Sequence, residues 1–135
     1  MTTITADAAA GVLCSDSYWF DGSECGECNK IYRVHGELIG LAGDMTKCKQ
    51  WLAAYKKDEP LKRFDVVALR LTQKGVSVWN VSDEWHDVQK RFAIGSGGVA
   101  ARGALAVGAS AQAAVRAAIT IDANSGGRVR TRRLS

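Results

Sequence analysis

Residues 30–44 read KIYRVHGELIGLAGD, and this stretch decides most of the fold. Two apolar runs, Lys30–Val34 and Glu37–Ala42, flank the dipeptide at residues 35–36, His-Gly, which suits a tight β-hairpin. Asp44 closes the stretch and has the side chain of a helix N-cap. The sequence here predicts two paired strands followed by a helix.

One apolar stripe marks the helix after Asp44. Its apolar side chains recur at spacings of three and four residues, at Met45, Cys48, Leu52 and Tyr55. Lys56 and Lys57 suit the negative end of the helix dipole, and Pro60 prevents continuation.

Further elements lie on both sides of this segment. A polar loop is expected from Asp16 to Lys30, and Ser110 is placed to cap the second of two alanine-rich helices. The predicted segments are Thr3–Ala6, Val12–Ser15, Phe64–Thr72, Val76–Val81, Arg91–Ile94, Val99–Val107 and Ala111–Ile121. This grouping favours an α+β protein, with sheets packed on one another and helices outside. The length fits one domain, residues 1–135, with a basic tail at 128–135.

Composition excludes several classes of protein. The chain is 47% hydrophobic and 24% charged, and no apolar run reaches membrane-spanning length. Its start, MTTITADAAAG, lacks an export signal, so we expect a cytoplasmic protein with no membrane partner. The net charge of +4 comes from four arginines after residue 127, because the rest is balanced. A solvated tail or a last strand explains them better than nucleic-acid binding does.

The four cysteines do not predict a metal or redox site. Cys25 and Cys28 have ligand spacing, but no second pair and no well-spaced histidines accompany them. Without an export signal, the thiols are expected to be reduced, and no cofactor is predicted.

Three residues could together make a nucleophile. Removal of Met1 would leave Thr2 with a hydroxyl and a free α-amine, so nucleophile and base would share one residue. Lys30 beside that hydroxyl would favour its alkoxide, and Asp16 would hold the lysine charged and in place. Retained Met1 would block the amine.

Two glycine-rich segments add polar groups. Residues 94–98 read IGSGG and residues 122–127 read DANSGG. Glycines permit close backbone approach, and Ser96, Asp122 and Ser125 could hold an ammonium or a water.

The succession TTI, KIYRV, LIGLAGD, FAIGSGG and DANSGGRV resembles the proteasome β-subunit and HslV family, in a shortened bacterial or phage-type form. The resemblance implies a four-layer αββα sandwich of the N-terminal-nucleophile (Ntn) hydrolase class. It also implies a threonine-type peptidase that assembles with itself into stacked rings around a chamber. Polypeptides would be its substrates, and an ATP-dependent unfoldase its partner.

The same resemblance implies a role for each site residue. Thr2 would be the nucleophile, with Lys30 tuning it and Asp16 holding Lys30. The Gly43 N–H would stabilise the oxyanion, and Ser96, Asp122 and Ser125 would surround the amine. The first specificity pocket would be shaped by Leu41, Met45 and Cys28, and would favour an apolar residue.

Two other interpretations remain open at this point. Residues 95–100, GSGGVA, fit the dinucleotide-binding pattern G-x-G-x-x-A, with Asp122 as a ribose ligand. Alternatively, the chain could be a ring-forming scaffold that kept the fold without turnover.

Overall fold

The computed structural model describes residues 2–21, 24–61, 65–80 and 84–135. It is a mixed α/β structure, with every strand pair among these residues antiparallel. The strands are β1 (Ile4–Asp7), β2 (Val12–Ser15), β3 (Tyr18–Asp21), β4 (Glu24–Glu27), β5 (Ile31–Val34), β6 (Glu37–Gly43), β7 (Val66–Thr72), β8 (Gly75–Trp79), β9 (Trp85–Asp87), β10 (Arg91–Ile94) and β11 (Arg130–Arg133). The helices are α1 (Met45–Lys56), α2 (Gly98–Ala106) and α3 (Ala111–Ile121).

Two larger sheets face each other and enclose the main core. The first has the strand order β10-β1-β2-β11 and the second β5-β6-β7-β8-β9, while β3 and β4 form a separate hairpin. Fully buried side chains such as Ile4 and Leu13 meet Leu38 and Leu69 between the sheets. A Cβ on Gly40 would lie 2.7 Å from Cγ2 of Ile4, so this glycine lets the sheets approach closely.

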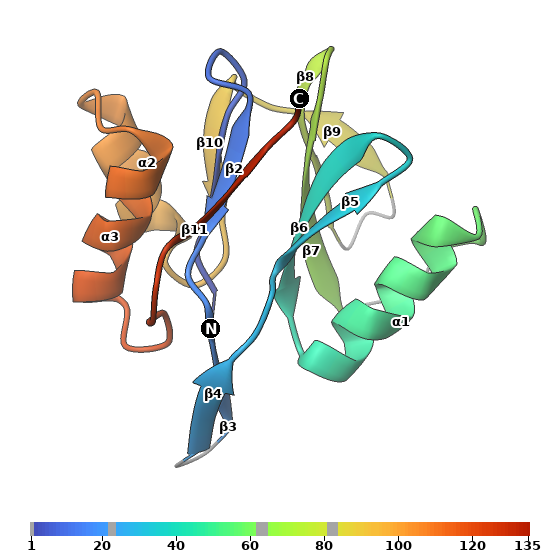
Figure 1. Cartoon of the computed structure of the whole chain (residues 1–135), viewed down its shortest axis with the longest axis horizontal. Coiled ribbons are helices and arrows are strands. Elements are labelled where there is room, and N and C mark those ends of the chain that lie inside the picture. The colour runs from blue at the N-terminus through green and yellow to red at the C-terminus, as the bar shows by residue number, and fades with distance from the viewer. Residues whose placement is uncertain (1, 22–23, 62–64, 81–83) are drawn as a thin grey trace.

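Helices cover the outer face of each sheet (Figure 1). On the first sheet, Val12 and Cys14 pack against Ala111 and Val115 of α3, and α2 packs on β10. On the second sheet, α1 buries Trp51 in an apolar cluster with side chains of β6, β7 and β8. Alanine suits the first interface because small side chains let a helix lie close to a sheet.

The central prediction from residues 30–44 is confirmed. His35 and Gly36 have φ of 53° and 75°, the left-handed conformations that a type I′ hairpin turn requires. The side chain of Asp44 accepts hydrogen bonds from the N–H groups of Thr46 and Lys47, as an N-cap does. Local sequence therefore sets where β6 begins after the turn and where α1 begins after Asp44.

The polar-loop prediction for residues 16–30 is wrong. The aromatic run in β3 pairs with β4, with Trp19 opposite Gly26 and Phe20 opposite Cys25. The Trp19 indole packs on Gly26 of the paired strand, and such cross-strand contacts stabilise a hairpin despite its polar composition. Strand β9 was also missed, while Phe64 and Val81 of the predicted strands lie outside the described residues.

The basic C-terminal segment includes a strand. Residues of β11 pair with β2, with Arg130 opposite Ser15 and Arg132 opposite Leu13. Arg130, Arg132 and Arg133 are therefore held in the edge strand of this sheet, whereas Arg128 precedes the strand. Within the described ranges, none of the helices combines the length and apolar character needed to cross a bilayer.

Candidate functional site

Thr2 and Thr3 lie just before β1, where two other segments hold them. Backbone bonds join Gly97 N–H to the Thr2 carbonyl at 3.2 Å and Asp16 N–H to the Thr3 carbonyl at 3.1 Å. A Cβ on Gly95 would lie 2.0 Å from the Thr2 carbonyl oxygen, and one on Gly97 equally close to the Thr3 hydroxyl. The glycines of residues 94–98 are thus needed for this contact.

Lys30 and Asp16 form a buried ion pair beside this segment. The Lys30 ammonium lies 2.9 Å from Oδ1 of Asp16, and the two side chains are 7% and 0% exposed. Asp16 also accepts the N–H of Thr3 on Oδ1 and that of Gly126 on Oδ2, both at 3.0 Å. Three donors compensate the burial of the carboxylate, and the carboxylate in turn fixes the position of the lysine ammonium.

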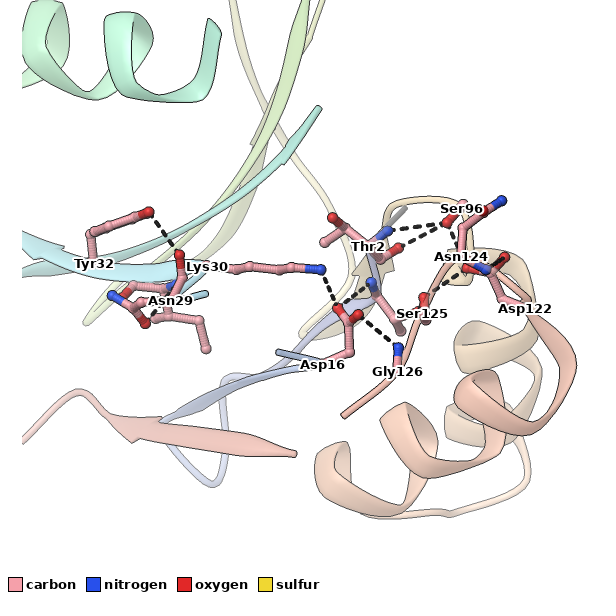
Figure 2. A network of polar contacts seen from close by, with 12 residues as sticks. Thr2, Asp16, Asn29, Lys30, Tyr32, Ser96, Asp122, Asn124, Ser125 and Gly126 are labelled. Carbon is pink, nitrogen blue, oxygen red and sulfur yellow. Dashed lines mark hydrogen bonds and ion pairs between the residues drawn. The ribbon is translucent and has the colours of Figure 1, made fainter. Parts of the chain in front are cut away.

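A second polar network meets the Thr2 nitrogen. Thr2 N–H donates to Oγ of Ser96 at 3.1 Å, and Ser96 donates to Oδ2 of Asp122 at 2.5 Å. Ser125 donates to the same carboxylate oxygen at 2.7 Å. Figure 2 shows Lys30 and Asp16 on one side of Thr2 and this network on the other.

The surroundings of Asp122 keep it ionised. Its partial burial alone would raise the carboxyl pKa, but hydrogen bonds from Ser96, Ser125 and the Asn124 N–H lower the pKa below its ordinary value. A stable anion lies one hydroxyl away from the Thr2 nitrogen. Such an arrangement can orient an amine and stabilise its protonated form.

Thr2 opens onto a cleft of about 930 Å³, although the residue itself is only 5% exposed. The cleft lies along β6 and the start of α1, and every residue expected in the specificity pocket borders it. Its lining includes Thr2, Lys30, Gly43 and Ser96 of the expected catalytic set, and Cys28, Leu41 and Met45. Asp16 and Asp122 lie behind this wall, hydrogen-bonded to Lys30 and Ser96, and Ser125 is hydrogen-bonded to Asp122.

Gly43 occupies a position that other residues would strain. Its φ is +142°, and a Cβ there would lie 3.0 Å from the Asp65 carbonyl oxygen. Glycine therefore lets β6 turn into α1 at the cleft, one residue before the Asp44 cap.

One wall of the cleft is aromatic, which the sequence patterns did not indicate. Trp19 and Phe20 of β3 and Tyr32 of β5 border the cleft as well. A Cβ on Gly26 would lie 2.6 Å from Nε1 of Trp19, so the indole rests on the backbone of β4. The run Tyr-Trp-Phe at residues 18–20 was the available signal, but acidic and glycine neighbours obscured it.

Two cysteines, Cys28 and Cys48, border the cleft as thiols whose ionisation is disfavoured by burial. Burial raises the pKa of Cys28, and it raises the pKa of Cys48 to about 11. No metal-binding cluster of cysteine, histidine and carboxylate side chains occurs in the part of the chain that the structure describes. Cys28 and Cys48 therefore act as wall residues of the cleft.

The dinucleotide interpretation does not fit this geometry. The loop of residues 95–98 is packed against Thr2 and Thr3, which occupy the space where a pyrophosphate would lie. Strand β10, before the loop, pairs antiparallel with β1, whereas the dinucleotide motif requires a parallel βαβ unit.

Comparison with solved structures identifies the fold. HslV from Trypanosoma brucei matches with a TM-score of 0.77 and 17% identity, over 96% of this chain and 97% of that one. BPH of Thiobacillus denitrificans matches with a TM-score of 0.77 and 20% identity, over 100% and 99%. The same protein in complex with epoxomicin gives 0.77 and 22%, over 98% and 99%.

No protein-family model and no curated protein matches the sequence. The structural matches cover nearly the whole chain on both sides, so the chain has the HslV-type fold. The resemblance expected from the sequence is confirmed at the level of fold.

Proposed function

We propose that the chain is a threonine-type endopeptidase in which Thr2, freed by removal of Met1, is the nucleophile. The observation that carries this proposal is the buried Lys30–Asp16 ion pair at 2.9 Å, bordering the cleft that Thr2 also lines. A fixed cation at that position lowers the free energy of a threonine alkoxide.

In the proposed reaction, Oγ1 of Thr2 attacks a peptide carbonyl carbon while its proton passes to the Thr2 α-amine, directly or through one water. The Gly43 N–H stabilises the oxyanion. Collapse breaks the C–N bond, and the leaving amine takes the proton from the ammonium. Water then hydrolyses the ester with the amine as base, which restores Thr2.

Ser96, Asp122 and Ser125 would orient the amine in these steps. The Thr2 nitrogen already donates to Ser96, and the free amine would keep this contact with one of its hydrogens. Its lone pair then stays available for the hydroxyl proton, and the Asp122 carboxylate stabilises the ammonium that forms.

Leu41, Met45 and Cys28 would form the first specificity pocket. All three border the cleft, and their side chains are apolar or weakly polar. An apolar residue before the cleaved bond is therefore preferred. A cleavage profile that required a charged residue there would contradict this pocket.

Assembly follows from the same proposal. An exposed hydrolytic threonine is safe in a cell only inside a chamber, so the chain is proposed to form stacked homo-oligomeric rings in the cytoplasm. Residues 1–135 would be one αββα domain of the Ntn-hydrolase class. Unfolded polypeptides, delivered by an ATP-dependent unfoldase, would be the substrates.

A scaffold with this fold and no turnover is the second candidate. Fold similarity alone does not distinguish it from the enzyme. The mass of the intact protein, with and without epoxomicin, separates the two. The enzyme is expected to lack the mass of Met1 and to gain one equivalent of inhibitor.

Two variants sharpen the experiment. K30A should lose the adduct, whereas K49A, which removes an exposed lysine of the same cleft, should keep it. Met1-free protein that takes up no inhibitor would favour the scaffold. An equal loss in K30A and K49A would contradict the role of the ion pair.

A further inference from the structure

Thr3, next to the nucleophile, touches both polar networks of the site. Its side chain is fully buried, and its N–H donates to Oδ1 of Asp16 at 3.0 Å. The same oxygen of Asp16 accepts the Lys30 ammonium. Thr3 Oγ1 lies 2.7 Å from Oγ of Ser125, which belongs to the Asp122 network.

The direction of the Thr3–Ser125 hydrogen bond can be assigned. A carboxylate only accepts, so Ser125 must use its single hydroxyl proton for Oδ2 of Asp122, 2.7 Å away. The Thr3 hydroxyl must therefore donate to Ser125. Proton donation runs from Thr3 through Ser125 to Asp122, and from the Thr2 nitrogen through Ser96 to the same oxygen.

We propose that Thr3 is a positioning residue, whose hydroxyl orients Ser125 and Asp122 and thereby the Thr2 amine. The inference rests on the proposed threonine peptidase function. The Thr3 N–H also fixes the segment before β1 to Asp16, so the two carboxylates of the site hold a fixed separation. Gly97 leaves room for the Thr3 hydroxyl, because a Cβ at Gly97 would collide with it.

Donation to Ser125 strengthens the bond that Ser125 in turn donates, because linked hydrogen bonds polarise one another. Without the Thr3 hydroxyl, Ser125 is free to rotate and to leave Asp122. The carboxylate then shifts relative to Ser96, and the Thr2 amine loses its orientation. Removal should slow the reaction of Thr2 without removing any group that touches the substrate.

Thr5, two residues further along the chain and within β1, offers a matched control. It is also fully buried, and its hydroxyl donates to the Ala111 carbonyl at 2.9 Å, away from the site. T3V and T5V therefore both replace a buried, hydrogen-bonded hydroxyl by a methyl group. Any effect on protein stability is shared, whereas an effect on Thr2 chemistry is expected in T3V alone.

The measurement is the second-order rate constant for adduct formation with epoxomicin on Met1-free full-length protein. T3V should lower this rate constant roughly tenfold, as expected for the loss of one hydrogen bond that supports the site. T5V should lower it less than about twofold. T3S, which keeps the hydroxyl, should recover most of the rate. Equal rates in T3V and T5V would overturn the inference.

The pH dependence of this rate constant distinguishes positioning of the amine from a purely structural role, which would leave it unchanged. Asp122 stabilises the protonated amine through Ser96, so T3V should lower the amine pKa and move the acid limb of the rate to lower pH. Asp16 and Lys30, the charged pair among the described residues that also borders this segment, are the same in every variant. An acid limb that T3V leaves in place argues against positioning.

A double-mutant cycle tests the route through Ser125. If Thr3 acts through Ser125, adding T3V to S125A should change the rate little, and full additivity would contradict that route. If T3V fails to fold, the rate constants of T3C and T5C are compared instead, because a thiol is a weaker hydrogen-bond donor than a hydroxyl.

Failure of the proposed function gives a different result. In that case the wild-type, Met1-free protein forms no adduct. The amine pKa of wild type, T3V and T5V, measured by NMR after reductive ¹³C-methylation, then decides the positioning role alone. An unchanged pKa in T3V would overturn it.

Discussion

Replacing Asp16 by asparagine tests how strongly the buried ion pair holds the site. Asp16 accepts three hydrogen bonds, from the Lys30 ammonium at 2.9 Å and from the N–H groups of Thr3 and Gly126 at 3.0 Å. An amide has one oxygen, so D16N turns its NH₂ group toward at least one of these donors. The buried lysine also loses its carboxylate.

These losses set the size of the effect. Removing one partner of a buried ion pair costs about 3–5 kcal/mol, and D16N should fall in that range. K30M should cost less, because Asp16 keeps two backbone donors when the lysine is gone. The double variant should lose less stability than the two single variants added together. Each single variant leaves one buried charge without its partner, and the double variant contains neither charge.

Urea unfolding followed by circular dichroism measures these free energies. D65N is the control, because Asp65 and Lys47 form a pair at 3.9 Å with side chains 82% and 50% exposed. Such a surface pair contributes about 0–1 kcal/mol. A cost for D16N no greater than that of D65N, or a larger cost for K30M than for D16N, would refute the reasoning.

Three further predictions concern the surroundings of the site. G95A should prevent inhibitor uptake and destabilise the fold, because the new Cβ would overlap the Thr2 carbonyl oxygen. G103A is the control: a Cβ at this position in α2 meets open space, so the substitution should raise the free energy of unfolding by about 0.5–1 kcal/mol. The pKa of Asp122 is lower in the folded state than its ordinary value of 3.8, so ionised Asp122 stabilises the fold at any pH above 3.8. This contribution is lost as the pH falls below 3.8, and D122N should therefore make the free energy of unfolding depend less on pH in that range. An unchanged dependence would contradict the lowered pKa. Iodoacetamide at pH 8 should label exposed Cys25 well before Cys48, whose pKa is about 11, and mass spectrometry of tryptic peptides would reveal the opposite order.

Local sequence alone determined the elements whose signals are carried within a few residues. The turn at His35-Gly36 needs two left-handed residues, and the cap at Asp44 needs one side chain beside the first N–H groups of its own helix. The cap at Ser110 likewise needs only one side chain beside the first N–H groups of α3. These features depend on contacts close in sequence, which a pattern can contain.

The tertiary structure decided what depends on distant contacts. Trp19 became part of the cleft because Gly26, on the paired strand, leaves space for the indole, and no local pattern records that pairing. The link from Thr3 to Ser125 joins residues that are far apart along the chain. Whether a buried hydroxyl donates or accepts there depends on which groups the fold brings together, so only the assembled sheets and loops could decide it.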